Sequence, residues 1–215
     1  MMKTKLLLLA ILFLAVASCT RVKTEYWPNG NKKSEITLRG KMYEGAACYW
    51  YENGNVQTTC SYKNNLLDGT LSSFYPSGLI QLEQNFSQGH LNGLVRTFDK
   101  FGKLLSQSTF VNDTLHGRYI EYYPNKFMKV DGNYVRGKLD GPWLYYDADG
   151  MVVGEGLFTL GNGVQKGFYE NGIAKQVTHY LKNQKHGEEV FYKPDGTVDV
   201  INKFDHGQLL EKIKR

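Results

Sequence analysis

Residues 133–150 read "NYVRGKLDGPWLYYDADG", and variants of this stretch recur along most of the chain. Within it an aromatic residue, Tyr146, stands four positions before a turn glycine, Gly150. Positions equivalent to Gly150 are separated by 24 residues five times, then by 22 and by 24. They are Gly30, Gly54, Gly78, Gly102, Lys126, Gly150, Gly172 and Gly196. This self-similarity divides residues 25–211 into eight units and indicates a repeat architecture.

A second glycine column lies downstream of each turn, fifteen residues on in most units. It comprises Gly45, Gly69, Gly93, Gly117, Gly141, Gly163 and Gly187. The distance from Gly150 to Gly163 is two residues shorter than in the other units. The sixth unit has therefore lost two residues between these glycines.

Two aromatic columns keep the same period. Four residues before the turn position stand Tyr26, Trp50, Phe74, Phe98, Tyr122, Tyr146, Phe168 and Tyr192. Eight residues after it stand Leu38, Tyr62, Phe86, Phe110, Tyr134, Phe158, Tyr180 and Phe204. Even spacings of this kind are typical of β-strands that bury one face. We expect these aromatic side chains to form the core of a sheet.

The residues just before each turn position have turn chemistry of their own. Four of the five prolines lie two residues before it: Pro28, Pro76, Pro124 and Pro194. Proline presets the backbone for the second residue of a type I turn, Asn or Asp suits the third, and glycine takes the left-handed conformation that follows. This combination predicts a three-residue hairpin loop with a bulge.

A second, looser turn is expected to join one hairpin to the next, at Asn65, Gly89, Asp113, Gly137, Asn183 and Gly207. The only helix signal after residue 18 is the short ending "LLEKIKR". The prediction is an all-β fold, an elongated array of about eight antiparallel β-hairpins of 24-residue units that form a twisted meander sheet. About sixteen strands would extend on the order of 75 Å.

One unit departs from the turn pattern: "EYYPNK" (121–126) places Lys126 where the others place glycine. Because the turn requires a left-handed residue there, we expect the lysine to cost roughly 1 kcal/mol relative to glycine. We interpret Lys126 as a tolerated substitution within the array and not as a functional lysine.

The stretches at 133–150 and 62–78 ("YKNNLLDGTLSSFYPSG") resemble bacterial MORN-repeat-variant proteins, many of which carry the label YwqK-like antitoxin. The resemblance extends over the repeat region and is weakest in the first unit (Lys32, Leu38) and in the shortened sixth unit. It implies a curved array of β-hairpins and a function in protein–protein or membrane-surface interaction.

The N-terminus is typical of an exported protein. A basic start, "MMKTK", precedes the apolar run "LLLLAILFLAVA", which is too short to span a bilayer and predicts a secretory signal peptide over residues 1–18. Val16 to Cys19 (Val-Ala-Ser-Cys) resemble a bacterial lipobox, which implies a lipid on Cys19; the alternative is an ordinary signal peptide with a chance cysteine. In a Gram-negative lipoprotein, a threonine and not an aspartate after the lipidated cysteine, as at Thr20, implies transfer to the outer membrane. We expect a lipidated tether over 19–24, the repeat domain over 25–211 and a tail over 212–215.

Charge and motifs give little sign of other chemistry. Without the lysines of the signal peptide, 24 basic residues face 21 acidic ones, and such a small surplus predicts no nucleic-acid partner. The chain lacks HExxH, CxxC and GxSxG motifs. His116 and His186 share a turn column, whereas His90, His179 and His206 fall in three other columns and suggest no cluster. We predict no catalytic residues, no metal and no cofactor.

Cys48 and Cys60 lie six residues on either side of Gly54. If Tyr51 pairs with Asn55, Cys48 faces Thr58 and Cys60 lies on the same face, one diagonal step away. A disulfide is permitted in an exported protein, and a pair of buried thiols is the alternative.

A row of aromatic residues lies one position nearer the turn than the first aromatic column: Trp27, Tyr51, Tyr75, Tyr123 and Tyr169. By alternation we expect this row on the opposite face, as a candidate interaction stripe. Packing of the same side chains against neighbouring turns is the alternative.

The sequence thus predicts a lipid-anchored, exported repeat protein of the cell envelope that interacts with another protein, which in an immunity role would be a toxin. Two other classes stay open: a structural envelope protein that binds glycan or peptidoglycan, and a glycan-degrading enzyme that uses carboxylates of neighbouring units.

Overall fold

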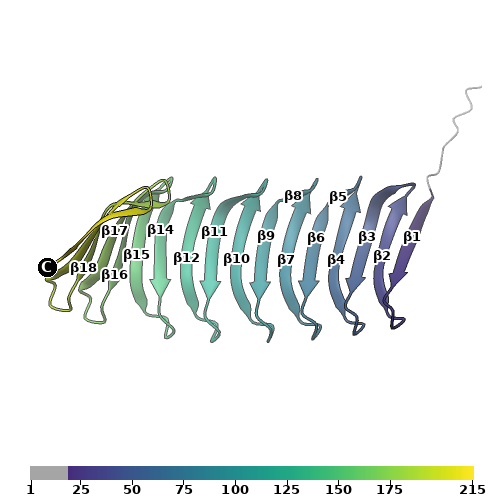
Figure 1. Cartoon of the computed structure of the whole chain (residues 1–215), viewed down its shortest axis with the longest axis horizontal. Coiled ribbons are helices and arrows are strands. Elements are labelled where there is room, and N and C mark those ends of the chain that lie inside the picture. Colours follow the sequence, from purple (N-terminus) through teal and green to yellow (C-terminus); the bar gives the residue numbers. More distant parts are fainter. Residues whose placement is uncertain (1–18) are drawn as a thin grey trace, which may run out of the picture.

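The computed structural model describes residues 19–215, and this part of the chain is all-β (Figure 1). Its twenty strands are β1 (Thr20–Tyr26), β2 (Lys32–Arg39), β3 (Met42–Trp50), β4 (Val56–Lys63), β5 (Leu66–Leu67), β6 (Gly69–Phe74), β7 (Ile80–Ser87), β8 (His90–Leu91), β9 (Gly93–Phe98), β10 (Leu104–Val111), β11 (Thr114–Tyr122), β12 (Met128–Val135), β13 (Lys138–Leu139), β14 (Gly141–Tyr146), β15 (Val152–Thr159), β16 (Asn162–Phe168), β17 (Ala174–Leu181), β18 (Gln184–Tyr192), β19 (Val198–Asp205) and β20 (Gln208–Lys214). The two-residue strands β5, β8 and β13 lead into β6, β9 and β14, which leaves seventeen full strands.

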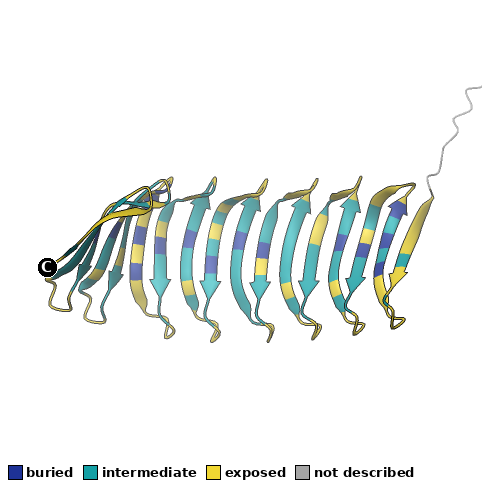
Figure 2. Ribbon diagram, viewed as in Figure 1, coloured by how far each residue is buried: buried dark blue, intermediate teal, exposed yellow. Residues whose placement is uncertain are grey.

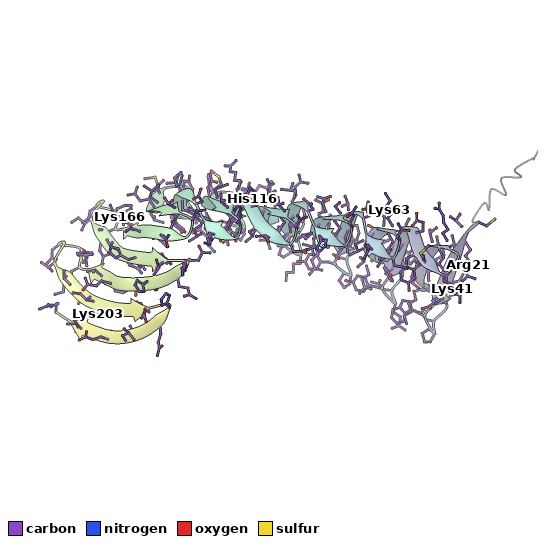
Figure 3. The ribbon with its side chains drawn as sticks, turned by 90° about the horizontal axis from the view of Figure 1, so that it is seen from above. Arg21, Lys41, Lys63, His116, Lys166 and Lys203 are labelled. Atoms are coloured by element: carbon purple, nitrogen blue, oxygen red, sulfur yellow. The ribbon has the colours of Figure 1, made fainter. Side chains whose placement is uncertain are left out.

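The strands form one antiparallel sheet in which each full strand pairs with the strands before and after it in sequence. The same holds from β10 to β20. The sheet twists along its length, as expected for many strands in one layer. Seen from above, the strands near Lys203 face the viewer, whereas those near Lys63 are seen edge-on (Figure 3). The predicted meander of hairpins is confirmed.

The sheet includes both segments that we expected outside it. Strand β1 starts at Thr20 and pairs with β2 from Thr20↔Arg39 onward, so residues 20–24 are not a tether. At the other end β20 runs to Lys214 and pairs with β19, with Ile213 opposite Ile201. Neither the tail nor its weak helix signal is realised, because pairing with a neighbouring strand satisfies the backbone of both segments.

The glycine and aromatic columns face each other across the strands. The seven cross-strand pairs are Gly45↔Tyr62, Gly69↔Phe86, Gly93↔Phe110, Gly117↔Tyr134, Gly141↔Phe158, Gly163↔Tyr180 and Gly187↔Phe204. We call the face that carries these pairs the inner face, and the other the outer face. Since glycine has no side chain, each ring has room to lie over the neighbouring strand.

The core of this sheet is thin and lies on the inner face. Eleven of the twelve buried residues other than glycine belong to that face, and Ile120 is the exception. They form scattered spots along the ribbon (Figure 2). One cluster of this core lies near the N-terminal end, where Ile36, Ala47 and Cys60 pack together. A chain of rings lies in the middle of the array, where Trp143 lies 5.0 Å from Tyr134 and 6.5 Å from Phe158 between ring centroids. No second layer covers the described sheet, so most side chains are only half-buried.

The tight turns follow the predicted chemistry. In the second unit the Tyr51 amide donates to the Asn55 carbonyl, and Gly54 has a φ of 89°. Lys126 takes the same left-handed conformation, with a φ of 76°, as the turn pattern predicts. Beyond each turn, however, the register shifts by one residue: Trp50 faces Val56, but Tyr49 faces Thr58. The same bulge recurs in every tight hairpin.

The second turn is tighter than we expected. Lys63 pairs directly with Leu66, and the two residues between them, Asn64 and Asn65, both have positive φ values. This is the geometry of a two-residue type I′ hairpin. The amide of its second residue donates to a carbonyl of the preceding unit, as in Gly89 N–H to Leu67 O at 2.7 Å. Successive hairpin tips are thereby stacked on one another.

The two-residue deletion of the sixth unit removes a bulge. In the fourth unit Ser108 faces Tyr119 but Phe110 faces Leu115, so three residues lie opposite one. In the sixth unit the ladder from Gly154 to Thr159 pairs with β16 without interruption. Because the bulge contains two extra residues, its loss leaves every side chain on its original face.

We expect Lys126→Gly to raise the free energy of unfolding by about 1 kcal/mol, because glycine adopts a positive φ without strain. Urea denaturation followed by circular dichroism measures the change. Gly78→Lys is the matched control, since a Cβ atom added there meets no atom within 4 Å and the backbone conformation carries the penalty. It should lower stability by a similar amount. Equal stability of Lys126→Gly and the wild type would contradict the prediction.

Candidate functional site

The outer face changes character along the array. In the N-terminal half, one cross-strand row on this face is polar, and its members are Thr59, Ser72, Glu83, Arg96 and Gln107. The continuation of this row in the last units is apolar apart from Glu155 and Lys166, and its members are Leu144, Val177, Val190, Ile201 and Ile213. A second row adds Pro142, Leu157 and Val164 beside it. We call these eight residues the C-terminal apolar face.

Pro142 and Leu157 of this face are exposed to solvent, and its other six residues are half-buried. Leu157 is 69% exposed and lies directly opposite Val164. A shallow hollow there is lined by Pro142, Leu144 and Leu157 together with Glu155 and Lys166. Glu155 and Lys166 are cross-strand partners, and Lys203 pairs with Glu211 at 2.9 Å farther along. An apolar surface with charged residues of both signs beside it is typical of a macromolecular interaction site.

The inner face shows the opposite change. Its central row passes from Ile36, Ala47 and Cys60 to Gln165, Thr178, Glu189 and Asn202. Glu189 is only 2% exposed and accepts hydrogen bonds from Lys185, Gln176 and Asn202. Burial alone would raise the pKa of its carboxyl group, but these hydrogen bonds and the Lys185 charge together lower the pKa. The polar network therefore keeps a buried carboxylate ionised.

The change in character of the outer face is also present in the sequence. Five residues after each turn position stand Glu35, Thr59, Glu83, Gln107, Asp131, Glu155, Val177 and Ile201. All eight belong to the outer face. Along the chain the first six are polar and the last two, Val177 and Ile201, are apolar. Because this column is polar in six of the eight units, it lacks the constant apolar character by which a buried column is recognised.

The five residues of the candidate interaction stripe are engaged within the fold. Each is half-buried at the base of a tight turn and donates a hydrogen bond to the main-chain carbonyl 23 residues later. The donor–acceptor pairs are Trp27–Trp50, Tyr51–Phe74, Tyr75–Phe98, Tyr123–Tyr146 and Tyr169–Tyr192, at 2.7–3.0 Å. This arrangement favours the alternative reading, in which the row packs against neighbouring turns.

Cys48 and Cys60 do not share a face. Because of the bulge, Cys48 faces Thr59 and not Thr58, while Cys60 faces Ala47 on the inner face. The predicted diagonal arrangement is wrong, since one extra residue in β4 reverses the side of every side chain relative to β3. Both thiols are free, and burial raises the pKa of each.

The turn column that contains His116 and His186 has a structural role. Its side chains accept a hydrogen bond from the amide 20 residues later, as in Asp68–Gln88 at 3.1 Å, Asp140–Leu160 at 2.9 Å and Asn162–Lys182 at 2.9 Å. In the same way, the Nδ1 atom of His116 accepts a hydrogen bond from the Arg136 amide at 3.4 Å. The expectation that His206 joins no cluster is wrong, because its ring lies 5.1 Å from that of His186. The sequence indicates this contact, because His186 and His206 are separated by the same 20 residues as the hydrogen-bonded pairs of the column.

The predicted signal peptide, residues 1–18, lies outside the described residues. Cys19 is exposed and immediately precedes β1. Within residues 19–215 there is no helix with the length and apolar character needed to cross a bilayer.

Comparison with protein families gives a match to the MORN repeat variant at residues 43–64, 91–112 and 139–159. Each segment contains one tight hairpin, and the segments begin 48 residues apart, which is twice the unit length. These three repeats of the chain are thus similar to MORN repeat variants. No curated protein matches the chain.

We expect Tyr75→Phe to lower the free energy of unfolding by about 1 kcal/mol, because the hydroxyl bond to the Phe98 carbonyl is lost. Tyr122→Phe is the control, since the Tyr122 hydroxyl makes no hydrogen bond to any described residue. Urea denaturation compares the two variants. If Tyr75→Phe keeps its stability but loses binding to a partner, the interaction-stripe reading is restored.

Proposed function

We propose that this chain is a lipid-anchored, exported repeat protein that acts as a protein–protein interaction or scaffold module. The observation that carries the proposal is the C-terminal apolar face, where Leu157, Val164 and Leu144 are presented together on an uncovered sheet. Burial of such side chains against a partner contributes roughly 25 cal/mol per Å² of apolar surface removed from water.

The repeat match supports the same reading, because MORN-type repeats commonly serve as binding modules. A regular backbone held by tight turns and stacked tips presents its surface in one fixed shape, which lowers the entropic cost of binding. The resemblance to YwqK-like antitoxins makes a toxin of an immunity pair the partner class that we favour.

The Val-Ala-Ser-Cys motif supports the membrane anchor. A lipid on Cys19 would hold the protein at the envelope membrane, with Thr20 favouring the outer membrane, facing the periplasm or the cell surface. Because β1 begins at Thr20, a lipid there would place the first edge of the sheet directly at the bilayer surface.

We expect Val164→Lys and Leu157→Lys to abolish capture of a partner from detergent-solubilised envelopes of the source organism. Both substitutions place a charge in the apolar face, where a partner would have to desolvate it. Thr70→Lys is the matched control, because Thr70 occupies the column of Val164 in a polar region of the outer face. Cross-linking and mass spectrometry identify what each variant retains.

Equal capture by all four proteins would place the interaction elsewhere. Binding to a glycan array without capture of any protein would overturn the proposal in favour of a structural envelope role.

We expect Cys19→Ser to release the protein from the membrane fraction into the soluble fraction, because the thiol that would carry the lipid is absent. Fractionation of the expressing cells and metabolic labelling with a fatty acid measure the effect. Cys48→Ser is the control and should stay in the membrane fraction. Membrane retention of unlabelled Cys19→Ser would contradict the anchor.

A further inference from the structure

Three metal-ligating side chains meet at the C-terminal end of the array. His186 comes from the turn column in β18, Asp205 ends β19, and His206 is the first residue of the type I′ turn before β20. Their ligand atoms all lie within 4.8 Å of one another. In other units, a side chain of the turn column contacts the hairpin tip 20 residues later. Here the same interval brings the imidazole rings of His186 and His206 together.

The contacts of His186 differ from those of the equivalent residues. Asp68, Asp140 and Asn162 each accept the amide of the tip above them. The Nδ1 atom of His186 is buried and makes no hydrogen bond. It lies 3.2 Å from Oδ1 of Asp205, and Nε2 of His206 lies 3.7 Å from the same oxygen. The Nδ1 atom thus lies beside the other two ligands and is not used to accept a backbone amide.

The two separations to the Asp205 oxygen, 3.2 Å and 3.7 Å, fit a small divalent transition metal. In tetrahedral zinc, with bonds of about 2.0 Å, neighbouring ligand atoms are roughly 3.3 Å apart. Two imidazole nitrogens and one carboxylate oxygen form a ligand set that zinc accepts, and a water molecule would complete four-coordination. The cluster is partly exposed, which leaves room for that water.

We propose that His186, Asp205 and His206 bind a divalent transition metal of the zinc class. The site does not depend on the partner proposed above, because it lies at the hairpin tips. A bound ion would connect β18 to the tip between β19 and β20 and so fix the last hairpin to the one before it. The last strand has a neighbour on one side only, and it is the part of the array that gains most from such a link.

Isothermal titration of full-length protein, purified without a histidine tag, with zinc chloride tests the proposal. We expect one zinc ion per chain and a midpoint of thermal unfolding that rises with zinc concentration. His206→Ala and His186→Asn should each weaken zinc binding by about tenfold or more. The asparagine variant should fold normally, since Asn92 and Asn162 occupy the same column in other units.

Two control variants make the test specific. His116→Asn changes the other histidine of the column, whose tip residue is Arg136, and should leave zinc binding unchanged. His90→Asn removes the other close histidine–aspartate pair, His90–Asp113 at 2.6 Å, and should also leave it unchanged. Absence of saturable zinc binding, or equal losses in the control variants and in His186→Asn, would overturn the proposal.

Discussion

The structure depends on one cross-strand pair that recurs seven times along the array, an aromatic ring beside a glycine. A single-layer sheet has no opposing layer against which to bury side chains, so its apolar contacts must come from rings that lie over their own neighbours. The pairs Gly117↔Tyr134 and Gly141↔Phe158 provide this in the middle of the array, where Trp143 joins the rings into a continuous chain. Hydrogen bonds between successive turns and between successive tips then hold each unit to the next. Stability therefore comes from contacts between nearest neighbours, as in other solenoids.

Two kinds of surface result from this arrangement. In the first units the central row of the inner face is apolar and that of the outer face is polar. In the last units this polarity is reversed, with Glu189 buried on the inner face and Val177 and Ile201 on the outer face. The aromatic–glycine pairs continue through the exchange, so the backbone does not change with it. The units thus share one scaffold, while the central rows between the pairs are free to determine what each part of the surface contacts.

Local chemistry was readable from the sequence, and long-range register was not. The left-handed conformation of Lys126 follows from its own turn, and the type of fold follows from columns repeated eight times. The face of Cys48 relative to Cys60 depends on one bulge residue in β4 that no side chain marks, because a bulge is a property of the pairing between two strands. The hydrogen bond from the Tyr75 hydroxyl to the Phe98 carbonyl could not be predicted, since that contact depends on the distance between two units. The apolar outer row was present in the sequence as a column that changes partway along the chain.

The uninterrupted pairing of β15 with β16 shows how independent the units are. A unit can lose its two-residue bulge and still stack, because its side chains keep their faces and its tip still reaches the preceding tip. Whole units, each of two strands, can by the same reasoning be added or removed, and each would change the length of the sheet by roughly 10 Å. With the anchor proposed at Cys19, the number of units sets how far the apolar face stands from the lipid surface. The length of the array, counted in hairpins, then determines this distance from the membrane.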